Sequence, residues 1–278
     1  MKDKIIRYLE TLDNENTRDR YARVLGYASE DLGDIEYITN IEFDKWIKSK
    51  EAWGSSSKYI AVNAIQSYIR WACGENHELL KYSFKRLPTA PQRYLTDKQA
   101  LMVLSVHDTM TEKGIRDLSI ASMLLDTGLR SSEICNIELD RVDMNQKSLV
   151  AWIKGGRWGT AVFSEITAQY TQNWIAIRES IANCKELYCG IGGSTPGKKM
   201  TRDGLRCVVA KWGKKVGIKL SPHDFRRTFA VMATKSGSPA RVLQEAGRWK
   251  SMEMVELYTR YITVDEFRQY LPVDRIMG

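Results

Sequence analysis

Residues 221–230 read SPHDFRRTFA and combine a helix start with a histidine and two adjacent arginines. Serine followed by proline is typical of a helix start, because serine caps free backbone N–H groups and proline suits the first helical position. His223 and Arg226 lie three residues apart, so both project from one face of the predicted helix. The first helical turns favour an anion. This stretch therefore predicts a phosphate-binding helix start, although a surface helix with ordinary cations would have the same pattern.

A third arginine occurs in residues 127–134, TGLRSSEI. Arg130 follows a glycine turn, and Ser131 or Ser132 is the expected cap of a helix that continues through residue 137. A guanidinium group binds two phosphate oxygens in one plane, and Glu133 could orient it. A surface Arg–Glu pair would look the same and contribute little to stability, so this segment alone does not decide between the two.

A β-hairpin is predicted between these two segments. Residues 148–153 alternate as a strand does, and residues 160–163 are the expected partner, joined through the glycine-rich turn KGGRWG at 154–159. Lys154 lies at the tip of this hairpin, where a lysine can reach into a groove. Arg157 is a second candidate in the same turn, and a solvated turn lysine is the plainer alternative.

The fourth segment, GRWKSMEMVELY at 247–258, ends at Tyr258, which is one of 13 tyrosines. In their order, the four segments resemble the tyrosine recombinases, the family of phage integrases and Xer-like proteins. Its members carry G-L-R-x-S-E, a hairpin lysine, H-x-x-R at a helix start, and G-[H/W] nine residues before a nucleophilic tyrosine. Trp249 lies nine residues before Tyr258, and the resemblance covers nearly all of residues 95–265.

Two positions depart from the family pattern. Arg248 stands between Gly247 and Trp249, so the alignment needs one inserted residue, with Trp249 at the His/Trp position. The alternative places Arg248 itself at that position. Arg227 stands where relatives often have a second histidine, outside the inferred catalytic set.

The resemblance implies a metal-free transfer of DNA strands through a covalent intermediate. Arg130 and Arg226 would stabilise the charge on the nonbridging oxygens of the scissile phosphate. Trp249 would donate its indole N–H or pack beside that phosphate. Glu133 would support Arg130.

The same resemblance implies that Tyr258 attacks the phosphorus and forms a 3′-phosphotyrosyl bond, leaving a free 5′-hydroxyl. A phenol normally loses its proton near pH 10, so His223 is the expected base. Lys154 would protonate the departing 5′-oxygen. Tyr261, one helical turn further on, is the alternative nucleophile.

The basic residues are unevenly distributed. The net charge is +8, but residues 1–86 contain 14 Lys and Arg against 14 Asp and Glu, so the excess lies entirely in residues 87–278. Any soluble basic protein has more Lys and Arg than Asp and Glu, but this uneven distribution favours a DNA-facing surface within residues 87–278. The candidate DNA contacts outside the catalytic set are Arg157, Lys211, Lys214, Lys215, Arg227 and Arg248.

The pattern predicts a mainly α-helical protein with a small β-sheet or hairpin. Apolar residues at helical spacing indicate an N-terminal four-helix bundle at 1–86, which the resemblance identifies as a SAM-like core-binding domain. The proline-containing stretch 87–94 is the expected linker. Residues 95–278 are the expected α+β catalytic domain. We expect no additional arm-binding domain of the kind that some phage integrases have.

Cofactors and membrane contact are not expected. The five cysteines lack a CxxC motif, and the three histidines have no zinc-ligand spacing. No GxxxxGK[ST] motif is present. No apolar run is long enough to span a bilayer, and the charged start MKDKIIRYLE is unlike a secretory signal. We expect a cytoplasmic, nucleoid-associated protein with reduced thiols.

Double-stranded DNA is the expected partner. The resemblance implies a monomer or weak oligomer in solution and a homotetramer on two synapsed DNA sites. The apolar residues at 263–278 would pack on their own domain or dock on a neighbouring protomer. Two alternative functions are type IB topoisomerase activity, which relaxation of supercoiled DNA without sequence preference would favour, and a catalytically silent DNA-binding regulator, which would form no covalent adduct.

Overall fold

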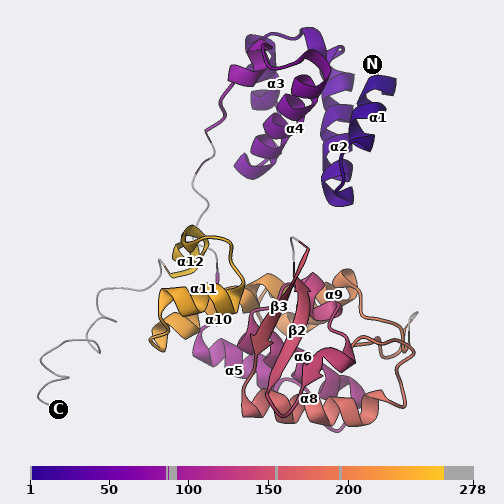
Figure 1. Ribbon diagram of the computed structural model, residues 1–278, viewed down its shortest axis with the longest axis vertical. Helices are drawn as coiled ribbons and strands as arrows, with labels where there is room; N and C mark the ends of the chain where they lie inside the picture. The colour runs from indigo at the N-terminus through magenta and orange to yellow at the C-terminus, as the bar shows by residue number, and fades with distance from the viewer. Residues whose placement is uncertain (1, 86, 88–92, 154–155, 194–195, 260–278) are drawn as a thin grey trace, which may run out of the picture. The chain divides into compact units, whose positions relative to one another are not determined.

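The computed structural model of the chain describes residues 2–85, 87, 93–153, 156–193 and 196–259 (Figure 1). It comprises two compact units, Met1–Ala90 and Pro91–Gly278, which are described separately below. That residues 1–86 and 95–278 act as core-binding and catalytic domains stays a prediction. Lys154, Tyr261 and the tail at 263–278 lie outside the described residues. Among the helices within the described ranges, none is long and apolar enough to cross a membrane.

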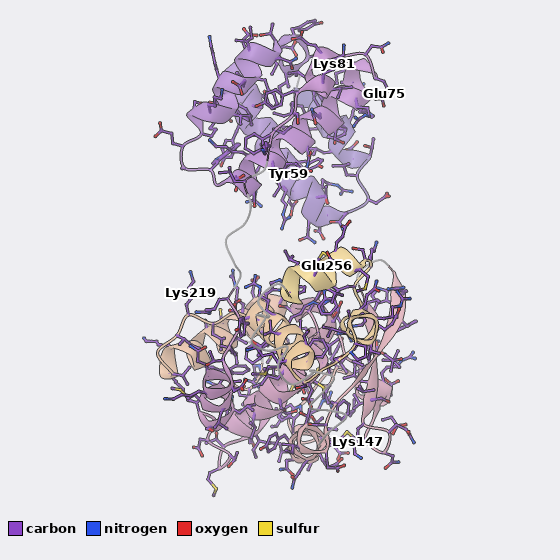
Figure 2. All side chains as sticks on the ribbon, turned by 90° about the vertical axis from the view of Figure 1, so that its left-hand side faces the viewer. Tyr59, Glu75, Lys81, Lys147, Lys219 and Glu256 are labelled. Atoms are coloured by element: carbon purple, nitrogen blue, oxygen red, sulfur yellow. The ribbon has the colours of Figure 1, made fainter. Side chains whose placement is uncertain are left out.

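The first unit is helical over its described length. Its elements are α1 (Lys2–Glu10), α2 (Glu15–Leu32), η1 (Ile35–Tyr37), α3 (Asn40–Ser49), α4 (Ser55–Cys73) and η2 (Glu78–Lys81). Their apolar faces meet in one core that includes Leu25, Phe43, Ile65 and Tyr68. Tyr59 lies on the opposite side of α4, exposed to solvent (Figure 2).

Side-chain caps explain where two of these helices begin. Asn14 accepts a hydrogen bond from the backbone of Thr17, which starts α2, and Thr39 forms a reciprocal capping box with Glu42 at α3. At α4, Gly54 is the N-cap, and the three serines that follow it are already inside the helix.

The second unit surrounds a small sheet with helices. Its helices are α5 (Asp97–Ser105), α6 (Glu112–Thr127), α7 (Ser131–Cys135), η3 (Leu139–Arg141), α8 (Glu165–Arg178), α9 (Arg202–Lys215), α10 (Pro222–Lys235), α11 (Ala240–Gly247) and α12 (Met252–Thr259). The buried helix α6 lies at its centre and contacts α5, α8, α10 and β3. Figure 2 labels Lys147, which is half-buried in the turn before β2, and Lys219, which is exposed on the connection between α9 and α10.

The sheet of the second unit is antiparallel in the described residues, with the order β1 (Val142–Asp143), β2 (Ser148–Ile153) and β3 (Arg157–Val162). Leu149 pairs with Ala161, and both are buried, whereas the cross-strand pair Trp152 and Trp158 is about half exposed. One face therefore joins the core. The mainly helical fold with a small sheet is confirmed.

One local prediction differs from the structure, because Arg130, not Ser131 or Ser132, is the N-cap of α7. Pro239 is the N-cap of α11. Helix α8 was not predicted from the sequence, because its buried face contains Thr167 and Thr171 besides Trp174, so its hydrophobic pattern is weak.

The last three described helices form a small cluster of their own. Trp249, Val255 and Tyr258 are buried together with Ala230 of α10 and Leu243 of α11. Glu256, on the outer side of α12, is exposed (Figure 2). This packing sets the position of Tyr258 relative to the start of α10.

Candidate active site

Arg226 connects two turns that are distant in sequence. Its guanidinium donates one hydrogen bond from Nη1 to the carbonyl of Gly128 and another from Nη2 to the carbonyl of Gly247, both at 2.5 Å. The side chain is 1% exposed. A planar fork is suited to such a double contact. The predicted residue Arg226 therefore fixes the turn before Arg130 against the turn before Trp249.

Both turns require glycine for a physical reason. Gly128 has φ +57°, and a Cβ there would lie 2.4 Å from the Phe229 ring. A Cβ on Gly247 would lie 1.8 Å from the ring of Trp249, which folds back over it. Because glycine has no Cβ, it can adopt a left-handed backbone and can tolerate such a close neighbour. The two glycines in the motifs thus allow these turns to come together.

Arg130 is held by the carboxylate that the sequence predicted. Glu133 accepts a hydrogen bond from the Arg130 backbone at 2.9 Å and one from its Nη1 at 2.7 Å. The Glu133 side chain is 1% exposed and that of Arg130 is 33% exposed. The guanidinium is therefore anchored on one side and open on the other, as an anion-binding group needs to be.

Trp249, Tyr258 and His223 lie next to Arg226. The Arg226 guanidinium carbon is 4.6 Å from the centre of the Trp249 ring, which is 5.2 Å from the Tyr258 ring. The His223 ring is 6.5 Å from that of Tyr258. The Trp249 indole N–H is buried and has no hydrogen-bond partner among the described residues. Four of the predicted residues therefore lie together, and the Trp249 indole N–H among them is able to donate a hydrogen bond to a ligand.

Positive charge and burial shift the ionisation of this site. Loss of hydration, followed by the charges of Arg227 and Arg226, lowers the pKa of His223 to about 4, although the residue is exposed at the surface. Burial and then the charge of Arg130 lower the pKa of Arg226 to about 10. His223 is therefore neutral at pH 7 and able to accept a proton, while Arg226 keeps its charge.

Arg248 has a left-handed backbone, with φ +55° and ψ +42°, directly before Trp249. This conformation is the one that glycine adopts readily. Whether Trp249 or Arg248 stands at the His/Trp position of the family stays a prediction. The Arg248 side chain is 4% exposed, so its environment differs from that of the surface DNA contact expected from the sequence.

Two further arginines, Arg202 and Arg206, lie beside the site. With Arg130 and His223, they line a hollow of about 390 Å³ between α7, α9 and α10. Sequence reasoning missed both, and their spacing of four residues at the start of α9 was the available signal.

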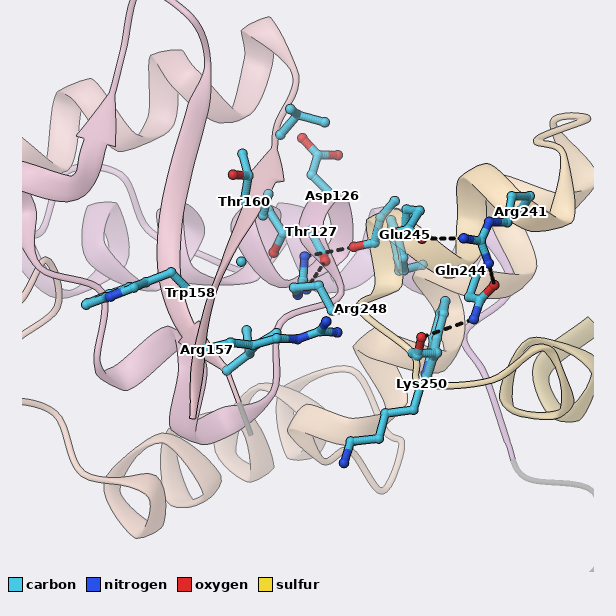
Figure 3. Close-up of a pocket in the computed structure, with 17 residues that line it drawn as sticks. Asp126, Thr127, Arg157, Trp158, Thr160, Arg241, Gln244, Glu245, Arg248 and Lys250 are labelled. Atoms are coloured by element: carbon cyan, nitrogen blue, oxygen red, sulfur yellow. Dashed lines mark hydrogen bonds and ion pairs between the residues drawn. The ribbon is translucent and has the colours of Figure 1, made fainter. Parts of the chain in front are cut away.

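The other predicted DNA contacts are distributed over several elements. Lys211, Lys214 and Lys215 are exposed on the far half of α9, which at 1.5 Å per residue puts Lys215 roughly 20 Å from Arg202. Arg157 lines a hollow of about 940 Å³ between β3 and α11 (Figure 3). Arg227 is paired with Asp224 at 3.1 Å. Their contact with DNA stays a prediction.

In the described part of the chain, no group of three or more His, Cys, Asp and Glu side chains is placed to hold a metal ion.

The chain is similar in sequence to tyrosine recombinases. Tyrosine recombinase XerC of Corynebacterium glutamicum is 25% identical over 86% of this chain and 81% of its own length. Tyrosine recombinase XerD of Staphylococcus haemolyticus is 25% identical over 92% of this chain and 91% of its own.

Solved structures share the fold. The Tn1549 transposon integrase in complex with transposon right end DNA has a TM-score of 0.76 at 18% identity, over 98% of this chain and 97% of the other. XerH recombinase bound to a palindromic difH substrate has a TM-score of 0.74 at 16% identity, over 92% and 80%. Residues 93–263, more than half of the chain, match the family model described as the phage integrase family. The chain belongs to the phage integrase family.

Proposed function

We propose that Tyr258 is the nucleophile with which this chain, a site-specific DNA recombinase, cleaves and rejoins DNA strands. One observation supports this assignment most strongly: the Tyr258 ring lies beside Trp249 and His223, and Trp249 in turn lies against Arg226. A phosphate placed there would meet a phenol, a neutral imidazole and two fixed guanidinium groups. Such a set matches the needs of in-line attack on phosphorus.

The arginines would stabilise the charge that develops on phosphorus. Arg130 has an open guanidinium face, whereas both Nη atoms of Arg226 already donate to backbone carbonyls. Arg226 therefore contributes mainly a fixed positive charge in a water-poor environment, and Arg130 offers direct hydrogen bonds. Trp249 would add its unpartnered indole N–H.

Proton transfer would involve two residues, His223 and Lys154. His223 is neutral at pH 7 because its pKa is lowered to about 4, so it can accept the phenol proton. Lys154, predicted from the family pattern to protonate the leaving 5′-oxygen, lies outside the described residues. The cleavage step forms a bond between phosphorus and the tyrosine oxygen and breaks the bond between phosphorus and the 5′-oxygen.

DNA is the proposed partner in this reaction. The Tn1549 integrase and XerH were solved as complexes with DNA. Because the phosphotyrosyl bond keeps the energy of the phosphodiester, a 5′-hydroxyl from another strand can reverse the step without a nucleotide. Strand exchange between two sites would bring four protomers together, and the family resemblance supports such a tetramer. The same resemblance supports a cytoplasmic protein that acts on the DNA of the nucleoid.

The proposal is tested by isolating the covalent adduct. Host DNA that co-purifies with the wild-type protein is sequenced and re-made as duplexes that carry a nick, so that a cut fragment can diffuse away. The protein is then incubated with these duplexes. We expect an adduct that survives denaturation and whose DNA-bearing peptide contains Tyr258. Tyr258→Phe should bind this DNA and form no adduct, whereas Tyr170→Phe on α8 should form it normally.

Other outcomes identify the alternatives. An adduct on Tyr261 would overturn the assignment of the nucleophile. No adduct in the wild type would favour a catalytically silent regulator. Rapid relaxation of supercoiled DNA without sequence preference would favour a type IB topoisomerase.

A further inference from the structure

The side chain of Arg248 makes a second connection beside that of Arg226. It donates from Nη2 to the carbonyl of Thr127 at 2.8 Å and from Nη1 to the carbonyl of Ala246 at 2.7 Å. Figure 3 shows this side chain reaching from the end of α11 to Thr127. Arg226 binds the next carbonyl of each turn, those of Gly128 and Gly247. Two arginines therefore connect the same two turns at adjacent peptide groups.

Arg248 also approaches the carboxylate that holds Arg130. Its Nε is 4.0 Å from Oε2 of Glu133, an ion pair without a hydrogen bond, since this Nε has no hydrogen-bond partner among the described residues. Oε1 of Glu133 accepts from Nη1 of Arg130 at 2.7 Å. The Glu133 side chain is 1% exposed and that of Arg248 is 4% exposed. A buried carboxylate needs compensating charge, and here it stands between two guanidinium groups.

The backbone of Arg248 is in a conformation that a side chain disfavours. Only Lys147 shares a positive φ among the non-glycine residues of the described ranges. Glycine would adopt this backbone more readily, so a glycine would be sufficient for the turn itself. We therefore look for the role of the arginine side chain in its contacts with the carbonyls of Thr127 and Ala246 and with Glu133.

We propose that Arg248 is a positioning residue for DNA cleavage, which holds the Trp249 turn against the Arg130 turn and shares the Glu133 carboxylate with Arg130. This inference rests on the proposed function, since it concerns the same phosphate. It acts on both sides of the site at once: through Ala246 it fixes the turn before Trp249, and through Glu133 it sets the guanidinium of Arg130. Its burial distinguishes this role from direct contact with DNA.

The test compares Arg248→Gly and Arg248→Lys with the wild type and with Arg241→Ala. Glycine suits the left-handed backbone, so the first variant removes the side chain without straining the turn. Arg241, with a side chain 74% exposed on the same helix, is the control for loss of one positive charge. The measurements are the single-turnover cleavage rate at saturating nicked DNA, the Kd for that DNA, and the thermal unfolding midpoint.

We expect Arg248→Gly to cleave about tenfold to a hundredfold more slowly at saturating DNA, the scale of a small misplacement of reacting groups. Its Kd should stay within about twofold of the wild type. Methylguanidinium added to the solution should restore part of the rate in this variant and leave Arg241→Ala unchanged. Arg248→Lys should be intermediate, because lysine keeps the charge and loses the fork.

A double-mutant cycle tests the connection through Glu133. If Arg248 acts through that carboxylate, the loss caused by Arg248→Gly should shrink when Glu133→Gln is already present. A wild-type rate in Arg248→Gly would overturn the proposal. So would a raised Kd with an unchanged saturated rate, which is the result for a DNA contact, or a lowered unfolding midpoint with an unchanged rate at a temperature where the variant is folded.

Failure of this inference is distinguishable from failure of the proposed function. If the adduct maps to Tyr258 and Arg248→Gly cleaves normally, only the role of Arg248 is wrong. If Arg248→Gly does not fold, Arg248→Lys provides the test. A wild-type cleavage rate with lysine would contradict the proposed need for the guanidinium group of Arg248. If Tyr258→Phe still forms the adduct, the nucleophile assignment fails whatever Arg248 does.

Discussion

In the first unit, α4 is packed through Ile65 and Tyr68, which are fully buried among apolar and aromatic neighbours. At the corner of α10, α11 and α12 in the second unit, a smaller apolar cluster is accompanied by the buried cations Arg226 and Arg248, which donate to backbone carbonyls. An apolar core stabilises a fold at no electrostatic cost. Burying a cation costs desolvation free energy. In the second region this cost accompanies a concentration of positive charge beside Tyr258. The difference separates a region built for stability from one built for an anion.

The largest expected effect is on catalysis in the second region. Arg226→Ala removes the fixed charge and both carbonyl contacts, so we expect single-turnover cleavage to fall by about two to three orders of magnitude. The measurement is adduct formation at saturating DNA. Arg226→Lys is the matched variant and should recover little, because an ammonium cannot bridge both turns. Near-normal cleavage in both variants would contradict the assigned role.

A core substitution in the first region should give the opposite result. Ile65→Ala leaves a cavity in the helical bundle and should lower the free energy of unfolding by about 2–5 kcal/mol. Chemical denaturation measures this change. Cleavage at saturating DNA should be nearly unchanged at a temperature where the variant is folded. A loss of rate as large as that of Arg226→Ala would remove the distinction between the two regions.

The two regions should also differ in their response to acid. The folded pKa of His223 is about 4, below the ordinary value near 6.5. The unfolded chain therefore takes up a proton between these pH values and the folded chain does not, so this region loses stability as pH falls from about 6.5 to about 4. His107 has the same shift, caused first by burial.

In the first region the acid-sensitive group is a carboxylate. Burial opposes ionisation of Glu36, but hydrogen bonds from Lys4 and Tyr68 outweigh it and hold its pKa below the ordinary value. Its contribution is present at neutral pH and is lost only below about pH 4.5. Hydrogen exchange of α4 and α10 amides, corrected for intrinsic rates, measures both windows. His223→Gln should reduce the loss in α10 alone; equal sensitivity of both helices at pH 5.5 would contradict this prediction.

The smallest effect is expected at the surface of the first unit. Arg70 and Glu75 form an ion pair at 3.0 Å with side chains 53% and 72% exposed. Arg70→Ala should change the free energy of unfolding by no more than about 1 kcal/mol, because solvent screens such pairs. A thermal melt at low and high salt measures it. A larger loss would show that an exposed ion pair contributes to the stability of this unit in addition to the contacts of Glu36.

Sequence patterns predicted the elements where local chemistry is unambiguous. Ser221 and Pro222 identified the start of α10, and the alternation at 148–153 identified β2. The buried threonines of α8 concealed that helix, because polar residues weaken its period. At the site, the order of motifs identified Arg226 and Tyr258 only through family resemblance. The double connection by Arg226 and Arg248 could not be predicted, since it depends on carbonyls 98 to 121 positions away in the chain.

The central claim is that Arg130, Arg226 and Tyr258 of one chain meet at a single phosphorus atom. A structure of the protein on a DNA site split at the scissile phosphate, with vanadate in the gap, tests it most directly. The account predicts vanadium bonded to the Tyr258 oxygen, Arg130 within hydrogen-bond distance of a nonbridging oxygen, and Arg226 directly behind it. Vanadium bonded to another residue, or a guanidinium pair distant from the vanadate, would contradict it.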